Sequence, residues 1–491
     1  MTDKKPAFEP DDDEVADAGG EIQDPILQAI PAGPNAEPPR EELLKRDHKA
    51  GREAGAGSPP AGRSTFEEAT RRGPLGWLQL LGPGLITGAS DDDPSGIGTY
   101  AQVGSQFGYS VLWTAVFTFP LMAAVQELCA RIALQTGVGL GTALRRKFPT
   151  WLIGICIAAL FVANTINVGA DLGAVAAGGS LLTKGALHQV WLVAPVAALV
   201  LGLQLFVTYS VIFKVFKWLT VTLFAYVITG LLIHPDVRQV ALASVVPHLE
   251  LSKGFIAALV AIFGTTISPY LFFWQATSEV NEMRAAGKVT EAERRGVTRS
   301  ELKAARTDIV IGMLFSNLVM YFIILTSAAV LHAHGKTNIQ SADQAAQALA
   351  PLAGEWAFVL FALGMIGTGL LAIPILTGSA AYAVKEFVGL KGGLSDKPWY
   401  RPTFYAIMAI STIAGISLNL LGIDPIRALF ITAVINGLVA PPLLVLIVML
   451  GSDRTIMKER TSGVVSRSLT WITTAVMAVA AVALLVTFLV P

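Results

Sequence analysis

From residue 76 to its end, the chain alternates between long apolar runs and short polar connectors. A helix needs about 20 apolar residues to cross the roughly 30 Å of hydrocarbon in a bilayer. Eleven runs are long enough: 76–102, 109–136, 151–183, 190–209, 211–233, 254–279, 307–331, 356–387, 402–422, 425–450 and 468–490. Several exceed the minimum, as tilted helices do. The pattern predicts an all-α integral membrane protein with 11 transmembrane helices.

Residues 1–75 have no such apolar runs. They are rich in Pro, Gly and Ala, and they hold 16 acidic and 10 basic residues, including the acidic run from Asp11 to Glu14. A segment with so few large apolar residues cannot bury enough surface to fold alone. It also lacks the basic start and short apolar core of a signal peptide. We therefore expect a disordered, acidic cytoplasmic tail.

The composition agrees with a membrane protein. Hydrophobic residues make up 53% of the chain and charged residues 15%, whereas soluble domains carry about 25% charged residues. Acidic and basic residues number 36 each, so no basic surface for nucleic acid is expected. Cys129 and Cys156 both lie in apolar runs. This placement favours packing roles and argues against a disulfide framework or a cysteine metal cluster.

The basic residues of the connectors predict the orientation. If the tail is cytoplasmic and eleven helices alternate, the cytoplasmic connectors with the adjoining span ends hold 21 basic residues, and the outer connectors with their span ends hold 5. Cytoplasmic loops carry an excess of Lys and Arg. We therefore expect a multi-pass protein of the plasma membrane with its N-terminus in the cytoplasm and its C-terminus outside.

Polar residues interrupt the first span. In LGPGLITGASDDDPSGIGTYAQ, three aspartates precede Pro94, Ser95 and Gly96. Proline removes a backbone donor and clashes with the preceding turn, and intramembrane charges usually mark an ion or substrate path. The alternative is an outer loop between two shorter helices. Because the flanking segments 76–89 and 97–103 are too short to span a bilayer, we expect a broken helix.

The sixth span is interrupted by the stretch GTTISP at residues 264–269. Taken alone, this stretch is equally compatible with a proline kink. Interrupted segments at corresponding places in two halves, however, are typical of a transporter's binding site. The spacing predicts a LeuT-like fold with a 5+5 inverted repeat in which helices 1 and 6 are broken. Its parts are a first repeat at 76–233, a second at 254–450 with a cytoplasmic loop at 280–306, and an additional helix at 468–490.

The sequence resembles the Nramp family of divalent metal transporters over roughly residues 75–450. The resemblance rests on GPGLITGASDDDPSG, on the second span QFGYSVLWTAVFTFPLMAAVQELCARIALQTG, and on GTTISP. Where the family has Asp-Pro-Gly-Asn, this chain has Asp93-Pro94-Ser95-Gly96. Where the family usually has Ala-x-x-Met-Pro-His, it has Thr265, Ser268, Pro269 and Tyr270 at the named positions.

The resemblance implies a metal site between the two breaks, and the substitutions imply its chemistry. A thioether favours soft transition metals, whereas Ser268 leaves only oxygen ligands, which suit Mg²⁺ and Mn²⁺. Gly96 lacks the amide side chain and leaves room for water. The pattern resembles the Nramp-related magnesium transporter branch, which lacks the methionine. The candidate metal ligands are Asp93, Ser95, Gly96, Thr265, Ser268, Asp92, Thr266 and Asn436.

The three aspartates cannot all face one ion, because successive residues point in different directions. We expect Asp93 to be the direct ligand and Asp92 or Asp91 to attract cations at the vestibule. The alternative role for Asp93 is to cap the second half-helix. Asn436, together with Thr432, is a further polar candidate from the tenth span.

Asp171 in the third span matches a family aspartate linked to proton movement. The family's second acid is Ala174 here, and Gln275 and Tyr270 replace two histidines, which puts proton coupling in doubt. Asp171 is therefore either a proton relay or a structural acid paired with Asn164 or Asn167. Glu127 and Arg131 are four residues apart, a spacing typical of an ion pair on one helix face. A structural pair is favoured over a gate.

We expect a secondary transporter that imports divalent metal ions, preferably Mg²⁺ and Mn²⁺, by alternating access in the lipid bilayer. It would need no cofactor besides the transported ion, no nucleic acid and no obligate protein partner. The alternatives are a proton-coupled Mn²⁺/Fe²⁺ symporter of the ordinary Nramp type, a cation-coupled symporter of a small organic solute, and a non-transporting metal sensor. The spans contain no nucleophile–base pair, phosphate loop or His-x-x-His motif, so an enzyme is not expected.

Overall fold

A computed structural model describes residues 83–489 apart from 208–220, 340, 391, 395, 397 and 420–423. The expected acidic tail, 1–75, lies outside the described residues. Throughout the described residues the secondary structure is helical.

Within the described residues, thirteen helices belong to the predicted spans: α4 (Pro83–Asp91), α5 (Pro94–Phe107), α6 (Trp113–Thr136), α8 (Thr150–Leu182), α9 (Gln189–Phe206), α11 (Phe224–Leu232), α13 (Lys253–Thr266), α14 (Pro269–Ala285), α16 (Arg299–Val330), α19 (Ala357–Val388), α20 (Pro402–Asn419), α21 (Pro425–Gly451) and α23 (Val464–Leu489). Further short helices lie between and beside them: α7 (Leu140–Lys147), α12 (Val237–Val245), α15 (Glu291–Arg294), α17 (Ala342–Ala346), α18 (Ala350–Ala353) and α22 (Arg454–Met457). The 3-10 turns are η3 (Gly108–Val111), η4 (Val221–Leu223), η5 (His332–His334), η6 (Gln347–Leu349), η7 (Gly354–Trp356) and η8 (Lys458–Arg460).

Eight spans in the described part are long and apolar enough to cross a membrane by length and composition. The predicted spans 76–102 and 402–422 correspond to the shorter helices α4, α5 and α20. Residues 211–220 of the predicted span 211–233 lie outside the described residues, and η4 and α11 form its described part. The membrane class is thus confirmed, and the count of eleven helices stays a prediction.

Two helices extend into the predicted cytoplasmic loop at 280–306, which the sequence predicts to be partly helical. α14 continues to Ala285, and α16 already begins at Arg299. The early start of α16 follows from a capping box, in which Thr298 and Glu301 satisfy each other's backbone N–H groups. Hydropathy alone placed the boundary at the first apolar residue and therefore missed this polar first turn.

Both predicted helix interruptions are present. α4 ends at Asp91 and α5 starts at Pro94; α13 ends at Thr266 and α14 starts at Pro269. Proline is favoured in the first turn of a helix, where its missing N–H has no partner to lose. Each proline therefore ends one half-helix by blocking its continuation and starts the next.

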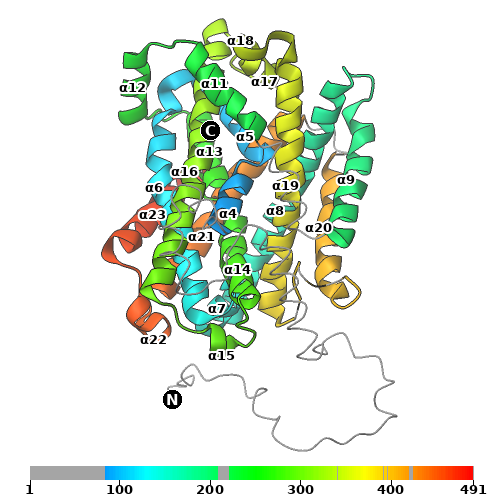
Figure 1. Cartoon of the computed structure of the whole chain (residues 1–491). Helices are drawn as coiled ribbons and strands as arrows, with labels where there is room; N and C mark the ends of the chain where they lie inside the picture. The colour runs from blue at the N-terminus through cyan, green and yellow to red at the C-terminus, as the bar shows by residue number, and fades with distance from the viewer. Residues whose placement is uncertain are drawn as a thin grey trace, which may run out of the picture.

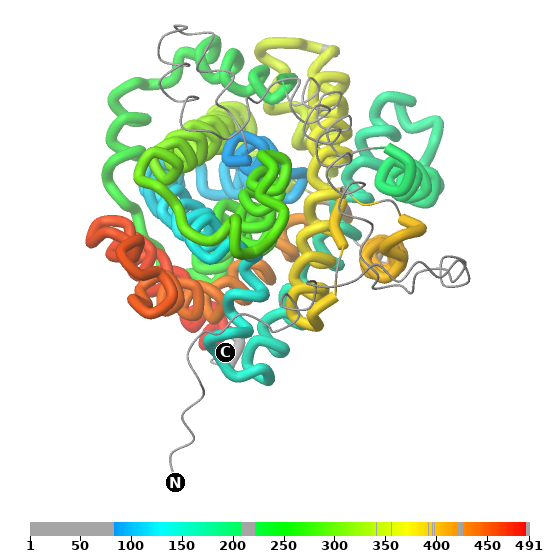
Figure 2. Tube along the Cα trace, turned by 60° about the horizontal axis from the view of Figure 1, so that its bottom comes forward, coloured from blue at the N-terminus to red at the C-terminus, as the bar shows by residue number. Residues whose placement is uncertain are grey.

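The broken helices lie inside the bundle. Figure 2 shows α4 and α5, in blue, surrounded by the other helices, and α16 packs against α4, α5 and α6. In Figure 1, α7, α15 and α22 lie at one end of the molecule and α11, α12, α17 and α18 at the other. The two half-helices of each pair thus meet within the bundle, away from both ends.

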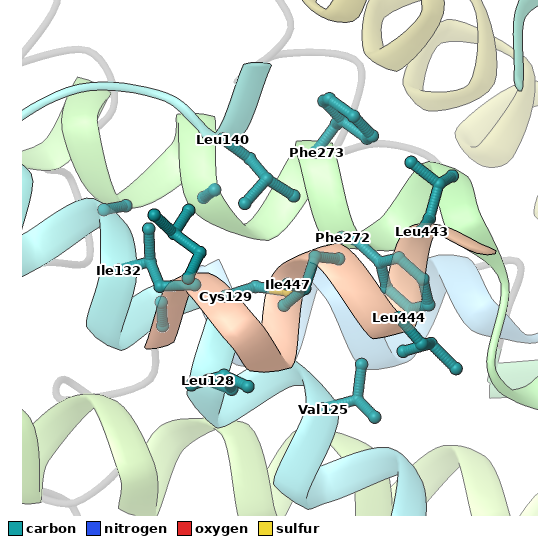
Figure 3. Close-up of a cluster of buried hydrophobic side chains, with 14 of the residues drawn as sticks. Val125, Leu128, Cys129, Ile132, Leu140, Phe272, Phe273, Leu443, Leu444 and Ile447 are labelled. Carbon is teal, nitrogen blue, oxygen red and sulfur yellow. The ribbon is translucent and has the colours of Figure 1, made fainter. Parts of the chain in front are cut away.

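Close packing holds this arrangement. Figure 3 shows a cluster in which α6, α14 and α21 interlock through Cys129, Phe272 and Ile447, all 0% exposed. Because lipid tails are as apolar as these side chains, dispersion and shape complementarity hold membrane helices together rather than burial from water. Both cysteines are buried and free, which confirms the prediction that they are packing residues.

Glycines bring the second break close to α21. A Cβ atom at Gly264 would lie 2.0 Å from the Ala433 carbonyl oxygen, and one at Gly437 would lie 2.4 Å from the Val260 carbonyl oxygen. Only glycine permits such an approach of two backbones. The end of α13 is thereby fixed against α21 next to the GTTISP interruption.

Candidate metal site

The two interruptions are joined by hydrogen bonds between the half-helices α4 and α14. The Tyr270 hydroxyl donates to the Ser90 carbonyl oxygen at 2.9 Å. One turn farther along, the Thr87 hydroxyl donates to Gln275 Oε1 at 2.6 Å. These bonds hold the half-helix before the first break against the half-helix after the second.

Asp93 lies at the start of α5 and is 2% exposed. Its Oδ1 accepts the backbone N–H of Gly96 at 2.7 Å, and its Oδ2 accepts Asn167 Nδ2 from α8 at 3.2 Å. The capping role considered for Asp93 is therefore present. A carboxylate has about four lone-pair directions, so capping leaves lone pairs that could bind an ion as well.

Asp91 and Asp92 face a different helix. The Ser316 hydroxyl of α16 lies 2.6 Å from Asp91 Oδ2 and 3.1 Å from Asp92 Oδ1. Among the described residues, Asp91 Oδ1 and Asp92 Oδ2 have no hydrogen-bond partner. The two side chains are 0% and 1% exposed, so they do not line an open vestibule in this structure. The expectation of a vestibule role is wrong for this conformation, because α16 covers both carboxylates.

Asp171 in α8 is completely buried, and the backbone N–H of Ser95 lies near its carboxylate; no side chain among the described residues forms a hydrogen bond with it. It is close enough to Asp93 for the two charges to interact. The proposed amide partners bond elsewhere: Asn167 to Asp93, and Asn164 Nδ2 to the Leu376 carbonyl oxygen at 3.2 Å. The interpretation of Asp171 as one half of an Asn–Asp pair does not fit these contacts.

The Ser268 and Thr266 hydroxyls of the second break both donate to backbone carbonyls of α13. Ser268 Oγ lies 2.7 Å from the Gly264 carbonyl oxygen and 2.8 Å from that of Thr265. Thr266 Oγ1 donates to the Ile262 carbonyl oxygen at 2.8 Å. Such bonds occupy the hydroxyl proton, so the oxygen lone pairs remain the part of each group that could face a cation. Thr265, Thr266 and Ser268 are all at most 2% exposed.

α21 contributes the remaining polar groups. Ser95 Oγ lies 3.3 Å from the Leu429 carbonyl oxygen and 3.4 Å from Thr432 Oγ1. Asn436 is 1% exposed, and its Oδ1 has no partner among the described residues. The tenth predicted span therefore places polar side chains beside α5.

Gly96 lies between the two sets of carboxylates. A Cβ atom there would be 3.2 Å from the Asp91 carbonyl oxygen and 3.5 Å from Asp93 Oδ1. A side chain at this position would enter the group of oxygens. It would also lie 3.3 Å from the Tyr100 ring, and the room for water at position 96 stays a prediction.

Sequence reasoning missed Ser316 and misassigned Asn167. The sequence carries a signal for both residues, because a Ser-Asn pair at 316–317 and an asparagine at 167 interrupt apolar runs. Polar groups inside a membrane usually bond to another group or take part in function. Within the described part of the chain, no group of three or more His, Cys, Asp or Glu side chains is arranged so that it could hold a metal ion by itself. The oxygens here are a mixture of carboxylates, amides, hydroxyls and carbonyls instead.

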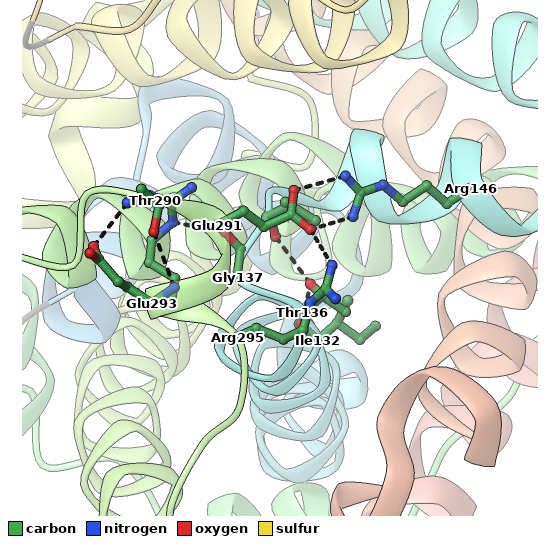
Figure 4. Close-up of polar contacts among 10 residues, drawn as sticks. Ile132, Thr136, Gly137, Arg146, Thr290, Glu291, Glu293 and Arg295 are labelled. Atoms are coloured by element: carbon green, nitrogen blue, oxygen red, sulfur yellow. Dashed lines mark hydrogen bonds and ion pairs between the residues drawn. The ribbon is translucent and has the colours of Figure 1, made fainter. Parts of the chain in front are cut away.

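The charged residues at one end of the molecule form separate ion pairs. Arg131 Nε donates to Glu127 Oε1 at 3.0 Å, while Ser466 Oγ of α23 donates to the other carboxylate oxygen at 2.8 Å. In Figure 4, Glu291 accepts both Arg146 and Arg295. The Arg146 hydrogen bonds hold the pKa of Glu291 below its usual range. The Glu291 pairs link α7 and α15, whereas the Glu127–Arg131 pair lies within α6.

An all-helical bundle whose two interrupted helices meet at buried carboxylates defines a LeuT-like membrane transporter. Solved structures support this fold. The Eremococcus coleocola manganese transporter superposes with a TM-score of 0.65 at 17% identity, covering 87% of this chain and 88% of that chain. Mhp1, a nucleobase-cation-symport-1 family transporter, superposes with a TM-score of 0.51 at 16% identity, covering 84% and 87%.

The family follows from the sequence match. Residues 84–487 match the family described as natural resistance-associated macrophage protein-like. The chain therefore belongs to the Nramp family, whose members are transporters and not enzymes. It is similar to the divalent metal cation transporter MntH of Pectobacterium carotovorum, with 25% identity over 390 residues, 76% of this chain and 86% of the relative. The MntH of Klebsiella pneumoniae is 26% identical over 375 residues, 73% and 82%.

Proposed function

We propose that this protein transports divalent cations, preferably Mg²⁺ and Mn²⁺, by alternating access at the site between the two broken helices. The observation that carries the proposal is the set of three buried carboxylates, Asp91, Asp92 and Asp93, with oxygen and amide groups around them. Burying several carboxylates together is unfavourable unless protons or cations compensate the charge. A divalent cation supplies that compensation.

The chemistry of the second break supports the preference for hard cations. Ser268 occupies the position where the family usually has methionine, and its oxygen replaces a soft sulfur. Mg²⁺ binds oxygen ligands at about 2.0–2.1 Å and keeps several waters, and Mn²⁺ also accepts carboxylate, carbonyl and water ligands. The space left by Gly96 suits an ion that retains part of its hydration shell.

The proposed ligands come from three elements. Asp93 and Ser95 belong to the first break, Thr265 and Ser268 to the second, and Asn436 to α21. The Gly96 backbone, Asp92 and Thr266 complete the set of candidates. Asp93 is the ligand we place first, because its side chain contacts both its own half-helix and α8.

A second candidate function is proton-coupled Mn²⁺/Fe²⁺ symport. The observation that favours it is Asp171, a completely buried carboxyl group that lies near Asp93 and to which no side chain among the described residues forms a hydrogen bond. A carboxyl in that position could carry a proton while the metal occupies the site. Metal flux that is unchanged by an imposed pH gradient would exclude this coupling.

The experiment is flux of Mg²⁺, Mn²⁺ and Ca²⁺ into liposomes containing the wild-type protein or Asp93→Ala. Thr474→Val in α23 is the matched control, because Thr474 is also buried but bonds only within its own helix. We expect wild-type and control flux of Mg²⁺ and Mn²⁺, and none with Asp93→Ala. Flux of iron or cadmium without Mg²⁺ would contradict the proposed preference, and uptake of an amino acid abolished by Asp93→Ala would indicate an organic solute.

We also propose that the protein lies in the plasma membrane with the end that carries α7, α15 and α22 in the cytoplasm. The basic residues support this orientation, because Arg146, Lys147 and Arg295 all lie at that end. Transport would then proceed from the opposite end toward the cytoplasm.

A further inference from the structure

The first turn of helix α4 is capped by a side chain that is distant in the sequence. The first amides of a helix have no partner within that helix, and a nearby Ser, Thr, Asp or Asn usually accepts them. In α4 the acceptor is Asp308 of α16. Its Oδ2 accepts the N–H of Gly84 at 2.6 Å and its Oδ1 lies 3.2 Å from the N–H of Leu85, 224 and 223 residues away.

The backbones of α4 and α16 also interlock beside this cap. A Cβ atom at Gly88 would lie 2.2 Å from the Gly312 carbonyl oxygen, and one at Gly312 would lie 2.1 Å from the Gly84 carbonyl oxygen. Glycines at such positions allow helices to approach to backbone contact. α4 can therefore sit on α16 only in this one alignment.

α14 holds the same half-helix from another side. Thr87 donates to Gln275 Oε1 at 2.6 Å, and Gln275 Nε2 donates to Glu279 Oε1 at 2.8 Å. Glu279 also lies close enough to Asp308 for the like charges of the two carboxylates to repel each other, so the holding contact on this side is the Thr87–Gln275 hydrogen bond. Figure 1 shows α4 between α16 and α14 in the half of the bundle that we propose as cytoplasmic.

We propose that Asp308 is a positioning residue of transport, which caps α4 from α16 and keeps the proposed cytoplasmic side of the aspartate site closed. The proposal rests on the proposed function, because it assumes that the ion leaves past α4. α4 ends at Asp91, and all three aspartates are at most 2% exposed. While Asp308 holds the first turn of α4, the carboxylates at its other end stay covered.

Loss of the cap shifts the equilibrium between the closed and open states of the proposed cytoplasmic side toward the open state. A hydrogen bond to a charged acceptor contributes enough free energy to shift a two-state equilibrium by about tenfold or more. Asp308→Ala removes both acceptors. Asp308→Asn keeps one oxygen acceptor and loses the charge, so its effect should be intermediate.

The test is the accessibility of a cysteine at Ser90, which is 0% exposed and lies next to the aspartates. Ser90→Cys is made in a background with Cys129→Ala and Cys156→Ala and treated with a membrane-impermeant maleimide in inside-out vesicles. We expect labelling at least about tenfold faster with Asp308→Ala, a smaller increase with Asp308→Asn, and no change with Thr307→Val. Thr307 is the matched control, since its hydroxyl bonds Lys303 within α16.

Equal labelling rates in the wild-type background and in Asp308→Asn would overturn the proposal. If Asp308→Ala is not monodisperse, Gln275→Leu provides the second variant, because it removes the link to Thr87, and an unchanged rate there counts against the proposal in the same way. Labelling needs no metal. Faster labelling without wild-type flux of Mg²⁺ or Mn²⁺ would therefore reject the proposed function alone, and normal flux with unchanged labelling would reject the role of Asp308 alone.

Discussion

The two helix interruptions have the same architecture but different chemistry. At the first, Asp93 bonds to α8 and Asp91 and Asp92 bond to α16. At the second, the Ser268 and Thr266 hydroxyls donate to carbonyls of the adjoining half-helix α13. The first break therefore carries the charge and the contacts between helices, while the second supplies neutral oxygens. We infer that the first break attracts the cation and that the second sets which cation fits.

The largest effect is expected at Asp93, whose role as helix cap and whose negative charge can be removed separately. Asp93→Asn retains an oxygen that can accept the Gly96 N–H, whereas Asp93→Ala removes both the cap and the charge. A lost cap costs about 1 kcal/mol of stability. We expect both variants to lose metal affinity by more than about 100-fold, and only Asp93→Ala to show a lower melting temperature. Calorimetric Mg²⁺ titration and thermal unfolding measure the two quantities.

Full metal affinity in Asp93→Asn would show that the first break does not attract the ion through its charge. The comparison between the two breaks would then have to be reversed, with the hydroxyls of the second break as the principal ligands.

The next effect concerns Ser316, which touches two of the aspartates without being a proposed ligand. Groups that orient metal ligands typically contribute 10–100-fold in affinity, so we expect Ser316→Ala to weaken Mg²⁺ binding by about tenfold. Ser327→Ala is the matched control, because Ser327 is buried on the same helix and its hydroxyl has no partner among the described residues. If both serine variants bind Mg²⁺ equally well, α16 does not orient the carboxylates.

The smallest effect is expected far from both breaks, at Glu291. Its pKa is lowered in the folded protein by Arg146, so the pair stabilises the fold above the usual Glu pKa of about 4.3 and loses that contribution as the pH falls through the lowered value. Because the pair is partly exposed, Glu291→Gln should reduce stability by only about 0.5–1 kcal/mol at pH 7. Unfolding of wild type and Glu291→Gln measured at pH 7 and pH 3 should differ only at pH 7, and metal flux should be unaffected.

The sequence was sufficient for the architecture and for one side of the site. The interruptions at Asp93-Pro94 and Ser268-Pro269 could be predicted because proline and charge within an apolar run have few structural explanations. The LeuT-like class then followed from the spacing of the two breaks.

The contacts across helices could not be predicted. α8 and α16 are apolar on most of their surface, so periodicity does not reveal which face points inward. The bonds of Asn167 to Asp93 and of Ser316 to Asp91, like the cap of α4 by Asp308, depend on helix rotation and register. These are set by backbone approaches such as Gly84 to Gly312, which a single sequence does not disclose.

The central claim is that an oxygen-only site selects hard divalent cations, and Ser268 tests it most directly. The measurement is the ratio of Mg²⁺ flux to Cd²⁺ flux in liposomes, for wild type and for Ser268→Met, with Thr474→Val as control. We predict that Mg²⁺ flux exceeds Cd²⁺ flux in wild type and control, and that Ser268→Met lowers the ratio by about tenfold because the thioether favours the softer ion. A wild-type protein that transports Cd²⁺ and excludes Mg²⁺, with a ratio unchanged by Ser268→Met, would contradict the account.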